Sequence, residues 1–436
     1  MRERGIHELY ADDPERAASL LWGQRSVSRR QFLRQNAVRS LAFALGTAIP
    51  FGHQFPSTLI PAAFAQSNQP FEIEGKEGLH VLNDRPLNAE TLPHFLNDEV
   101  TPTNRLFIRN NGLIPEIAKK QDISNWQLQI DGEVEKPLTL SMQDLKTQFS
   151  SVTMQLILEC AGNGRAAFYP KASGNQWTYG AIGCPMWTGV RLKDVLDAAG
   201  VRASAVYTAY YGLDIHPSGD LQKTVISRGT PMAKALEETT LLAYAMNGEP
   251  LSPYHGFPVR LVCPGYPGSA SGKWLKRIWI RDQVHDGPKM TGSSYRVPQH
   301  PVAPGTKVPK SDMKIIEHMP VKSLITFPES GIEIAAAQRP SVTCRGSAWT
   351  GSGHVTAVHV SYDFGQTWVA AKLSPPRNTM AWQRWEAKLA LPSKGYYEIW
   401  ARATDSTGKM QPMVVPGWNP KGYLNNAAHR IAVSVI

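Results

Sequence analysis

The sequence predicts two structured domains, an α+β domain followed by an all-β sandwich, with a proline-rich segment between them. The chain has 436 residues, which is long enough for two or three domains. Apolar residues make up 42% of the chain and charged residues 19%, so hydrophobic cores are expected and disorder is not. The 35 glycines and 33 prolines are typical of a sheet protein rich in turns rather than of a helical bundle.

The α+β domain is expected at residues 66–290, where short strands and a few helices follow one another without regular alternation. Apolar residues alternate over 126–130, and β-prone runs cover Thr153–Leu158 and Trp274–Ile280. A helical stripe runs over Leu192–Leu196, and a glycine shortly after it ends the helix. This mixture favours an α+β domain over a doubly wound sheet.

The all-β sandwich is expected at residues 322–436, after a linker at 291–321. Four prolines between Pro298 and Pro309 exclude a packed helix or an inner strand within the linker. Beyond the linker, short stretches of alternating apolar residues are separated by turns, which is the pattern of a β-sandwich. These stretches are 358–362, 397–403 and 431–435.

Residues 1–65 are interpreted as an export signal. Ser28–Leu33 reads S-R-R-Q-F-L, which is a twin-arginine motif. Glycine and proline interrupt the uncharged stretch that follows, so it cannot supply the roughly 20 continuous apolar residues of a membrane span. Ala63–Ala65 is a small-x-small cleavage site, so the mature chain is expected to begin at Gln66, in the periplasm. The twin-arginine route carries folded proteins, commonly loaded with a cofactor, so the signal also indicates a cofactor.

Charge and cysteine content exclude several classes of protein. The net charge of +10 suits an anionic substrate or a mildly acidic partner, but no Lys/Arg-rich run of the kind that binds nucleic acid is present. The four cysteines are too few for a disulfide framework and form no C-x-x-C pair, which excludes the common zinc, redox and haem-attachment motifs. They are Cys160, Cys184, Cys263 and Cys344.

The segment Glu159–Arg165 reads E-C-A-G-N-G-R and presents Cys160 on a loop of small residues, directly after a β-prone run. Its two glycines allow another group to approach the sulfur closely, and Arg165 places a cation near it, which favours the thiolate. Three interpretations compete: a buried structural cysteine, a nucleophile, and a ligand to a soft or high-valent metal. The polar loop disfavours the first, and the lack of a histidine nearby in sequence disfavours the second. A metal ligand fits best.

This segment does not stand alone, because an ordered set of motifs over residues 80–436 resembles the sulfite oxidase family of molybdopterin enzymes. Glu159–Arg165 is similar to the molybdenum-cysteine motif of that family. The other similar segments are Phe107–Asn111, Tyr211–Asp214, His255–Arg260, Ser271–Trp274, Ser361–Trp368 and Trp418–Arg430. The resemblance implies an α+β molybdopterin-binding domain of the sulfite oxidase type, followed by an immunoglobulin-like dimerisation domain, and therefore a homodimer.

The resemblance also implies roles for individual residues. Cys160 would be the sole protein ligand of molybdenum, in a molybdenum-molybdopterin cofactor whose own sulfur and oxo groups complete the coordination. The substrate pocket would be formed by Arg109, Arg165, Arg430 and Trp177. Guanidinium groups suit this role because they stay charged and bind an oxyanion through two N–H groups at once. The cofactor would contact Phe107, Ile108, Arg109, Asn110, Asn111, Asp214, His255, Arg260, Ser271, Gly272 and Lys273.

The sequence departs from the family pattern in two places. Asn111 stands where many relatives carry histidine, which bears on how the substrate is placed and how protons are handled. The active-site tyrosine of the family has no counterpart in Val225–Arg228, and Tyr210 or Tyr211 is the candidate to replace it.

The resemblance implies oxidation of sulfite to sulfate at molybdenum. No C-x-x-C-H motif is present, so no bound haem is expected and the electrons would pass to an external c-type cytochrome. Three alternatives remain open. The first is a sulfane dehydrogenase acting on carrier-bound sulfur, and the second is a reductase of oxidised methionine, which the C-terminal sandwich disfavours. The third is a non-catalytic periplasmic binding module, for which replacement of Cys160 by serine would leave function intact.

Overall fold

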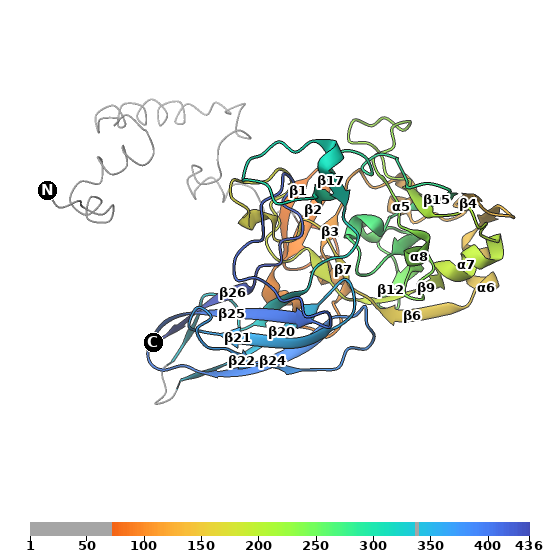
Figure 1. The fold of residues 1–436 in the computed structure, drawn as a ribbon. Coiled ribbons are helices and arrows are strands. Elements are labelled where there is room, and N and C mark those ends of the chain that lie inside the picture. The colour runs from red at the N-terminus through yellow and green to blue at the C-terminus, as the bar shows by residue number, and fades with distance from the viewer. Residues whose placement is uncertain (1–71, 336–339) are drawn as a thin grey trace, which may run out of the picture. The chain divides into compact units, whose positions relative to one another are not determined.

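The computed structural model describes residues 72–335 and 340–436 (Figure 1). The predicted export signal, its cleavage site and residues 66–71 lie outside these ranges. As predicted, the described chain is mostly sheet with a few short helices. None of the helices within these ranges is both long and apolar enough to cross a membrane.

One five-stranded sheet forms a wall of the N-terminal domain in the order β11-β10-β15-β4-β5. Its strands are β4 (Leu128–Gly132), β5 (Leu138–Leu140), β10 (Tyr207–Gly212), β11 (Ser227–Arg228) and β15 (Leu275–Arg281). β15 runs parallel to β4, whereas the other neighbours are antiparallel. The predicted run Trp274–Ile280 thus corresponds to β15, shifted by one residue.

A second sheet has the order β13-β12-β9-β6, with β14 paired to β12. Its strands are β6 (Ser151–Gln155), β9 (Met186–Arg191), β12 (Leu241–Met246), β13 (Glu249–Pro250) and β14 (Arg260–Val262). Smaller sheets join β1 (Leu79–Asp84), β2 (Leu87–Thr91) and β3 (Ile108–Arg109), and pair β7 (Leu158–Glu159) with β8 (Ile182–Gly183).

Short helices cover these sheets because their apolar residues fall on one face. The helices are α5 (Glu116–Lys120), α6 (Met142–Gln148), α7 (Leu192–Ala199) and α8 (Met232–Ala235). In α7 the predicted stripe of Leu192, Val195 and Leu196 is fully buried. Gly200 follows with φ of +68°, a left-handed conformation that ends the helix as predicted.

The segment predicted to be a linker contains a short two-stranded ribbon, in which β16 (Arg296–Pro298) pairs with β17 (Met313–Ile315). The chain between these strands is mostly exposed. Pro301, Pro304 and Pro309 therefore occupy a surface loop, whereas Pro298 ends the short strand β16, where its missing N–H is tolerated.

The C-terminal domain consists of two sheets that share one hydrophobic core (Figure 1). One has the order β18-β20-β24-β23 and comprises β18 (Lys322–Phe327), β20 (Ser341–Trp349), β23 (Lys372–Leu373) and β24 (Gln383–Ala390). The other has the order β19-β26-β25-β21-β22 and comprises β19 (Ile332–Ile334), β21 (Val355–Ser361), β22 (Val369–Ala370), β25 (Gly395–Asp405) and β26 (His429–Val435). The predicted β-rich domain is confirmed, while its immunoglobulin-like topology stays a prediction.

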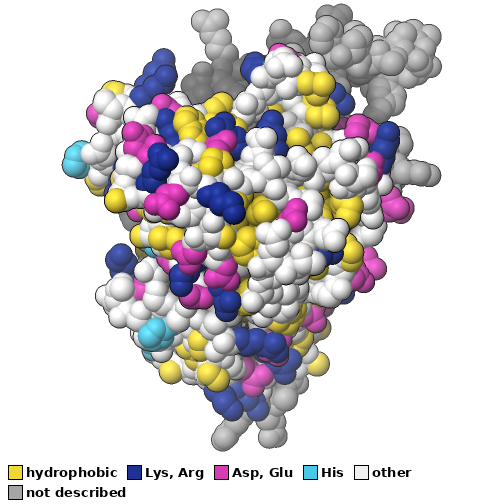
Figure 2. All heavy atoms as spheres, turned by 90° about the vertical axis from the view of Figure 1, so that its right-hand side faces the viewer, with side chains coloured by type: hydrophobic (Ala, Val, Ile, Leu, Met, Phe, Trp, Pro, Cys, Tyr) yellow, Lys and Arg dark blue, Asp and Glu magenta, His cyan; other side chains and the backbone are white. Residues whose placement is uncertain are grey.

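The surface carries charges of both signs. On the face shown in Figure 2, lysine and arginine side chains are interspersed with aspartate and glutamate. This face has the mixed composition of an ordinary protein surface rather than the continuous basic stripe of a nucleic-acid-binding protein.

Candidate active site

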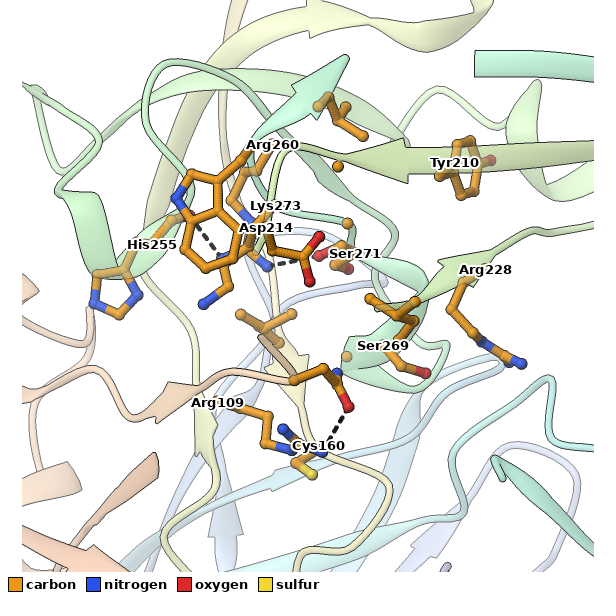
Figure 3. Close-up of a pocket in the computed structure, with 18 of the residues that line it drawn as sticks. Arg109, Cys160, Tyr210, Asp214, Arg228, His255, Arg260, Ser269, Ser271 and Lys273 are labelled. Carbon is orange, nitrogen blue, oxygen red and sulfur yellow. Dashed lines mark hydrogen bonds between the residues drawn. The ribbon is translucent and has the colours of Figure 1, made fainter. Parts of the chain in front are cut away.

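A pocket with about 820 Å³ of space, part of it open to solvent, lies where several strands of the N-terminal domain end (Figure 3). The end of β3, the turn after β7, the end of β10 and the loop before β15 all contribute to its wall. The predicted residues that line it are Phe107, Arg109, Asn111, Cys160, Asp214, His255, Arg260, Ser271, Gly272 and Lys273. Motifs distant in sequence thus meet at one site.

Cys160 presents its sulfur from a tight turn. The residue follows β7, and its backbone N–H donates to the carbonyl of Ala181 at 2.9 Å. The N–H of Asn163 donates back to the carbonyl of Cys160 at 2.9 Å, and Gly164 closes the turn with φ of +89°. The side chain of Cys160 is 5% exposed and lines the pocket. A rigid backbone therefore fixes the direction of a buried thiol.

Arg109 lies directly beside this sulfur (Figure 3). Its guanidinium donates to the side-chain oxygen of Asn111 at 3.0 Å and to that of Asn88 at 3.3 Å. Burial lowers the pKa of Arg109, but the phenol of Tyr295 and the thiol of Cys160 raise it by more, and the net pKa is raised. The pocket therefore holds a permanent positive charge next to the thiol.

Tyr295 is the main site residue that the sequence did not reveal. Its ring is 5% exposed, stacks on Tyr423 at 5.6 Å, and brings its hydroxyl within 3.3 Å of Asn111 and 3.4 Å of Arg109. Burial raises the pKa of this phenol, but the cations of Arg109 and Lys289 lower it by more, so the net pKa lies below that of an ordinary tyrosine. Tyr295 was missed because it lies in the segment predicted to be a linker.

The two tyrosines suggested from the sequence do not take this position. Tyr210 lines the pocket, but its hydroxyl is paired with Thr230 at 2.7 Å. The ring of Tyr211 packs against His285 with centroids 5.8 Å apart. Neither hydroxyl is hydrogen-bonded to Arg109 in the described structure, so the suggestion of Tyr210 or Tyr211 is corrected to Tyr295.

Lys289 is a second cation that the motifs did not indicate. It precedes Tyr295 in the chain, and its ammonium donates to the side-chain oxygen of Asn111 at 2.9 Å. Burial and the neighbouring guanidinium of Arg109 lower its pKa. The side-chain oxygen of Asn111 therefore accepts hydrogen bonds from Arg109, Lys289 and Tyr295. This arrangement occupies the position at which a histidine was expected from the family pattern.

A group of buried cations occupies another part of the pocket. Arg260 is 3% exposed and donates to the backbone carbonyls of His255 at 3.2 Å and Ser271 at 3.0 Å. Lys273 donates to the carbonyl of Tyr254 at 2.8 Å and to the side chain of Asn110. Burial lowers the pKa of Arg260 to about 9, and burial together with neighbouring cations lowers the pKa values of His255 and Lys273. Such a group favours an anionic ligand.

Asp214 adds one carboxyl group to the pocket, close to Lys273 (Figure 3). Burial raises its pKa to about 6, although Lys273 acts in the opposite direction. Gly212 lies beside it, and a Cβ at Gly212 would come within 2.6 Å of the carbonyl of Lys273. The close approach of the two loops therefore depends on this glycine.

The segment Phe107–Asn111 divides between the pocket and the core. Phe107 and Asn111 line the pocket, and Asn110 reaches it through the amine of Lys273. Ile108 is fully buried in a small cluster with Ile73 and Ala89, so its side chain points away from the pocket, as strand alternation requires.

Arg165 and Trp177 lie behind Cys160 rather than on the pocket wall. Arg165 is 6% exposed, and its guanidinium donates to the carbonyls of Lys421 at 2.6 Å and Asn175 at 2.7 Å. Trp177 is fully buried in the core that contains Cys160, and its indole N–H has no partner in the described structure. Both side chains could donate to a group bound at the sulfur, and the unpaired indole N–H is an observation that a bound ligand would explain.

The C-terminal domain closes over the same turn. Besides Lys421, the N–H of Leu424 donates to the carbonyl of Ala161 at 3.0 Å, and the side chain of Asn425 donates to the carbonyl of Gly164 at 2.8 Å. The backbone around Cys160 is therefore held from both domains.

The prediction that Arg430 joins the substrate pocket is wrong. Its side chain is 55% exposed and pairs with Glu398 at 2.9 Å on the outer face of the C-terminal domain. His429 and Ile431 on either side of it are buried, so strand alternation in β26 turns Arg430 toward solvent.

Glu159, the residue before the thiol, is buried in a polar network that joins the two domains. Its carboxylate accepts hydrogen bonds from Lys322 at 2.6 Å, Trp349 at 2.9 Å and Asn163 at 3.0 Å. Glu159 is 2% exposed and the Lys322 side chain 6% exposed. The carboxylate is thus compensated by one cation, Lys322, and by two neutral donors, Trp349 and Asn163. Of these three, Lys322 and Trp349 belong to the C-terminal domain.

These groups fit a metal cofactor with an anionic end. Over residues 72–335 and 340–436, no group of three His, Cys, Asp or Glu side chains is arranged to hold a metal ion. One thiol, a set of buried cations and one carboxyl group instead suit a cofactor that brings most of the metal ligands itself, carries an anionic group and presents hydrogen-bond donors.

The comparison with protein families also indicates a metal cofactor with an anionic end. Residues 114–289 match the oxidoreductase molybdopterin binding domain, and residues 313–436 match the Mo-co oxidoreductase dimerisation domain. The chain thus carries the two domains of a molybdopterin-binding oxidoreductase. The first matched range lies in the N-terminal domain of the fold and the second covers the C-terminal domain.

Individual relatives narrow this class. The mitochondrial sulfite oxidase of Homo sapiens is 35% identical over 82% of this chain and 66% of its own length. The sulfite oxidase of Gallus gallus is 33% identical over 81% of this chain and 77% of its own length. This chain thus spans slightly less than two thirds of the human protein. It belongs to the sulfite oxidase family of molybdopterin enzymes.

Two further matches are a nitrate reductase and a sulfane dehydrogenase. The nitrate reductase [NAD(P)H] of Hordeum vulgare is 32% identical over 82% of this chain and 41% of its own length. The crystal structure of the sulfane dehydrogenase SoxCD from Paracoccus pantotrophus superposes with a TM-score of 0.66 at 27% identity. That match covers 88% of this chain and 92% of the other.

Proposed function

We propose that this protein oxidises sulfite to sulfate and passes the electrons to a separate c-type cytochrome. The observation that carries the proposal is the guanidinium of Arg109 beside the buried thiol of Cys160, with Asn111, Lys289 and Tyr295 around it. A small anion that reacts next to the sulfur ligand of a metal would meet permanent positive charge and hydrogen-bond donors there. The sulfite oxidases among the relatives support the same substrate.

Molybdenum-molybdopterin supplies the redox chemistry of this reaction when it is bound, by accepting two electrons and exchanging an oxygen atom. Cys160 would provide the protein sulfur at the metal. His255, Arg260 and Lys273 would hold the anionic end of the cofactor, and Asp214 would accept hydrogen bonds from its amino groups. Ser271 and Gly272 would contact it through the loop before β15 (Leu275–Arg281).

The substrate would be bound by the side chains at the Asn111 end of the pocket. The balanced reaction converts sulfite and water into sulfate, two protons and two electrons. Arg109 would bind two oxygen atoms of the anion and neutralise its charge, and Lys289 would add a second positive charge. The Oη atom of Tyr295, which accepts from Arg109 and donates to the side-chain oxygen of Asn111, would donate its hydrogen bond to the same anion instead.

The proposed setting is the periplasm, reached by the twin-arginine signal with cleavage after Ala65. We further propose a homodimer, which the match to the Mo-co oxidoreductase dimerisation domain supports, and an immunoglobulin-like topology for that domain. The electron acceptor is proposed to be separate, since the sequence has no C-x-x-C-H motif and therefore no haem of that kind is expected.

A second candidate is the oxidation of sulfane sulfur on a carrier protein. The structural match to the sulfane dehydrogenase SoxCD supports it, because it covers most of both chains. The chemistry at the metal would be similar, but the substrate would be a sulfur atom on a protein side chain, so the pocket mouth would have to admit that chain.

The experiment that tests the proposal is sulfite-dependent reduction of a c-type cytochrome by the purified holoprotein. Cys160→Ser should abolish turnover. Arg109→Ala should raise KM about 100-fold or more, because a lost charge-assisted pair costs roughly 3 kcal/mol. Arg430→Ala is the matched control, since Arg430 is exposed and does not line the pocket, and the KM of this variant should be unchanged.

Each outcome distinguishes the candidates. If the holoprotein contains molybdenum but sulfite gives no turnover, sulfite is excluded, and reduction of the cytochrome by a persulfide-bearing carrier protein would establish the second candidate. If turnover persists in Cys160→Ser, Cys160 is not the metal ligand. If Cys160→Ser contains no molybdenum and still performs the biological function of the wild type, the protein is a non-catalytic binding module.

A further inference from the structure

Lys76 lies beside the group of buried cations although no motif includes it. Its ammonium nitrogen is 2.6 Å from Nε2 of His255 and donates to the carbonyls of Thr103 at 2.5 Å and Leu106 at 3.0 Å. His255 in turn is 2% exposed and lines the pocket next to Arg260. Lys76 thus extends the group to four basic side chains: Lys76, His255, Arg260 and Lys273.

Within the described residues none of these four side chains forms an ion pair, and the one acidic group near them is the carboxyl of Asp214 beside Lys273. The polar partners of Lys76 and Arg260 are backbone carbonyls or a histidine, and neither side chain forms an ion pair there. The charges acting on His255 are all positive, namely those of Lys76, Lys273 and Arg260. Burial lowers the pKa of Lys76 to about 7. Several cations brought together away from water are unfavourable unless an anion joins them.

The segment that carries Lys76 has few other attachments. In Glu72–Gly78, Ile73 packs with Ile108, and the N–H of Glu77 donates to the carbonyl of Asn104 at 3.0 Å. Gly75 and Gly78 both have positive φ, so this segment is a turn rather than part of a strand. Its lysine is therefore the main polar side-chain contact between the start of the described chain and the pocket.

We propose that Lys76 binds the phosphate of the molybdopterin cofactor together with His255, Arg260 and Lys273, and that this contact anchors Glu72–Gly78 to the N-terminal domain. The inference rests on the proposed cofactor but not on any substrate. A phosphate dianion supplies the negative charge that the four basic groups lack, and a lysine binds it as a point charge. Cofactor binding and ordering of Glu72–Gly78 would then be linked.

The test compares Lys76→Met and Lys76→Arg with the wild-type holoprotein, and uses Lys136→Met as the control because Lys136 is exposed. Molybdenum and pterin content are measured during extended dialysis. Lys76→Met should lose both about 10- to 100-fold faster than wild type, the range expected for one charge-assisted hydrogen bond. Lys76→Arg keeps the charge and should stay within about threefold of wild type, while Lys136→Met should match it.

A second measurement follows the segment itself. Endoproteinase Glu-C cuts after Glu72, Glu74 and Glu77, so none of these sites is altered by the substitutions. Cleavage should be slow in wild-type holoprotein and at least tenfold faster in cofactor-free wild type and in Lys76→Met.

The outcomes separate this inference from the proposed function. Equal cofactor retention in Lys76→Met and wild type would overturn it, even if Glu-C cleavage became faster, because Lys76 would then be only a structural tether. A wild-type protein without molybdenum would overturn both proposals. Neither readout involves sulfite, so a failed substrate assay leaves the test of Lys76 intact.

Discussion

Replacement of Lys322 by methionine should destabilise the protein strongly, because it leaves the carboxylate of Glu159 buried without its cation. Glu159 is 2% exposed and would keep only the neutral donors of Asn163 and Trp349. Breaking a buried ion pair by removing one partner costs about 3–5 kcal/mol. A loss of about 4 kcal/mol corresponds to a roughly thousandfold shift in the folding equilibrium.

The measurement is urea unfolding of the purified protein, followed by tryptophan fluorescence. Lys322→Met should lower the midpoint at an unchanged m-value. The double variant Glu159→Gln/Lys322→Met should recover much of the loss, because the uncompensated charge is then removed. Lys372→Met, on an exposed position of β23 (Lys372–Leu373), is the control and should stay within about 0.5 kcal/mol of wild type.

The reasoning would be refuted by a loss below about 1 kcal/mol for Lys322→Met, since that is the value of an exposed ion pair. It would also fail if the double variant were as unstable as the sum of the single ones. In that case the two side chains would act independently, and the network around Glu159 would not join the domains energetically.

Three further predictions follow from other contacts. A Cβ at Gly162 would overlap the guanidinium of Arg165, so Gly162→Ala should displace that group from the carbonyls of Lys421 and Asn175 and destabilise the protein by about 1–3 kcal/mol in urea unfolding. The pKa of Asp214 is raised to about 6, so between about pH 4 and 6 the folded cofactor-free protein binds more protons than the unfolded chain. The free energy of unfolding should therefore fall as pH rises through this range. In urea titrations at several pH values, Asp214→Asn should remove this pH dependence. His429 accepts from the N–H of Ile325 at 3.1 Å, and burial lowers its pKa to about 3. Stability should therefore fall as pH drops below about 6.5, by roughly 1.4 kcal/mol per unit, and His429→Asn should weaken that dependence.

The spacing of apolar residues along the sequence predicted those helices and strands that bury one face and expose the other. The stripe of α7 and the alternating strands of the C-terminal domain are examples. The run Thr153–Leu158 was predicted as one strand, but the structure divides it into β6 and the start of β7. The N–H of Leu156 donates to Pro185 and that of Ile157 to Met380, and both partners are distant in sequence. Such tertiary hydrogen bonds leave no local signal.

The same limit applies to the site. Motif residues such as Cys160 and Arg260 were located from the sequence because each lies in a short recognisable segment. Tyr295 was missed because nothing in its local sequence distinguishes it from a linker residue. The sequence does contain a signal for Arg430, because the alternation that predicts the strand at 431–435 also places residue 430 on the outward face.

The hydrogen bonds between the turn at 160–165 and residues 421–425 have a consequence for biosynthesis. A ribosome completes the N-terminal domain long before it reaches these late residues, and domains generally fold in that order. The turn that carries the thiol therefore lacks part of its support until almost the whole chain has left the ribosome. Nascent or C-terminally shortened chains would present a loosely held cysteine turn, so the time for stable metal insertion comes after translation ends.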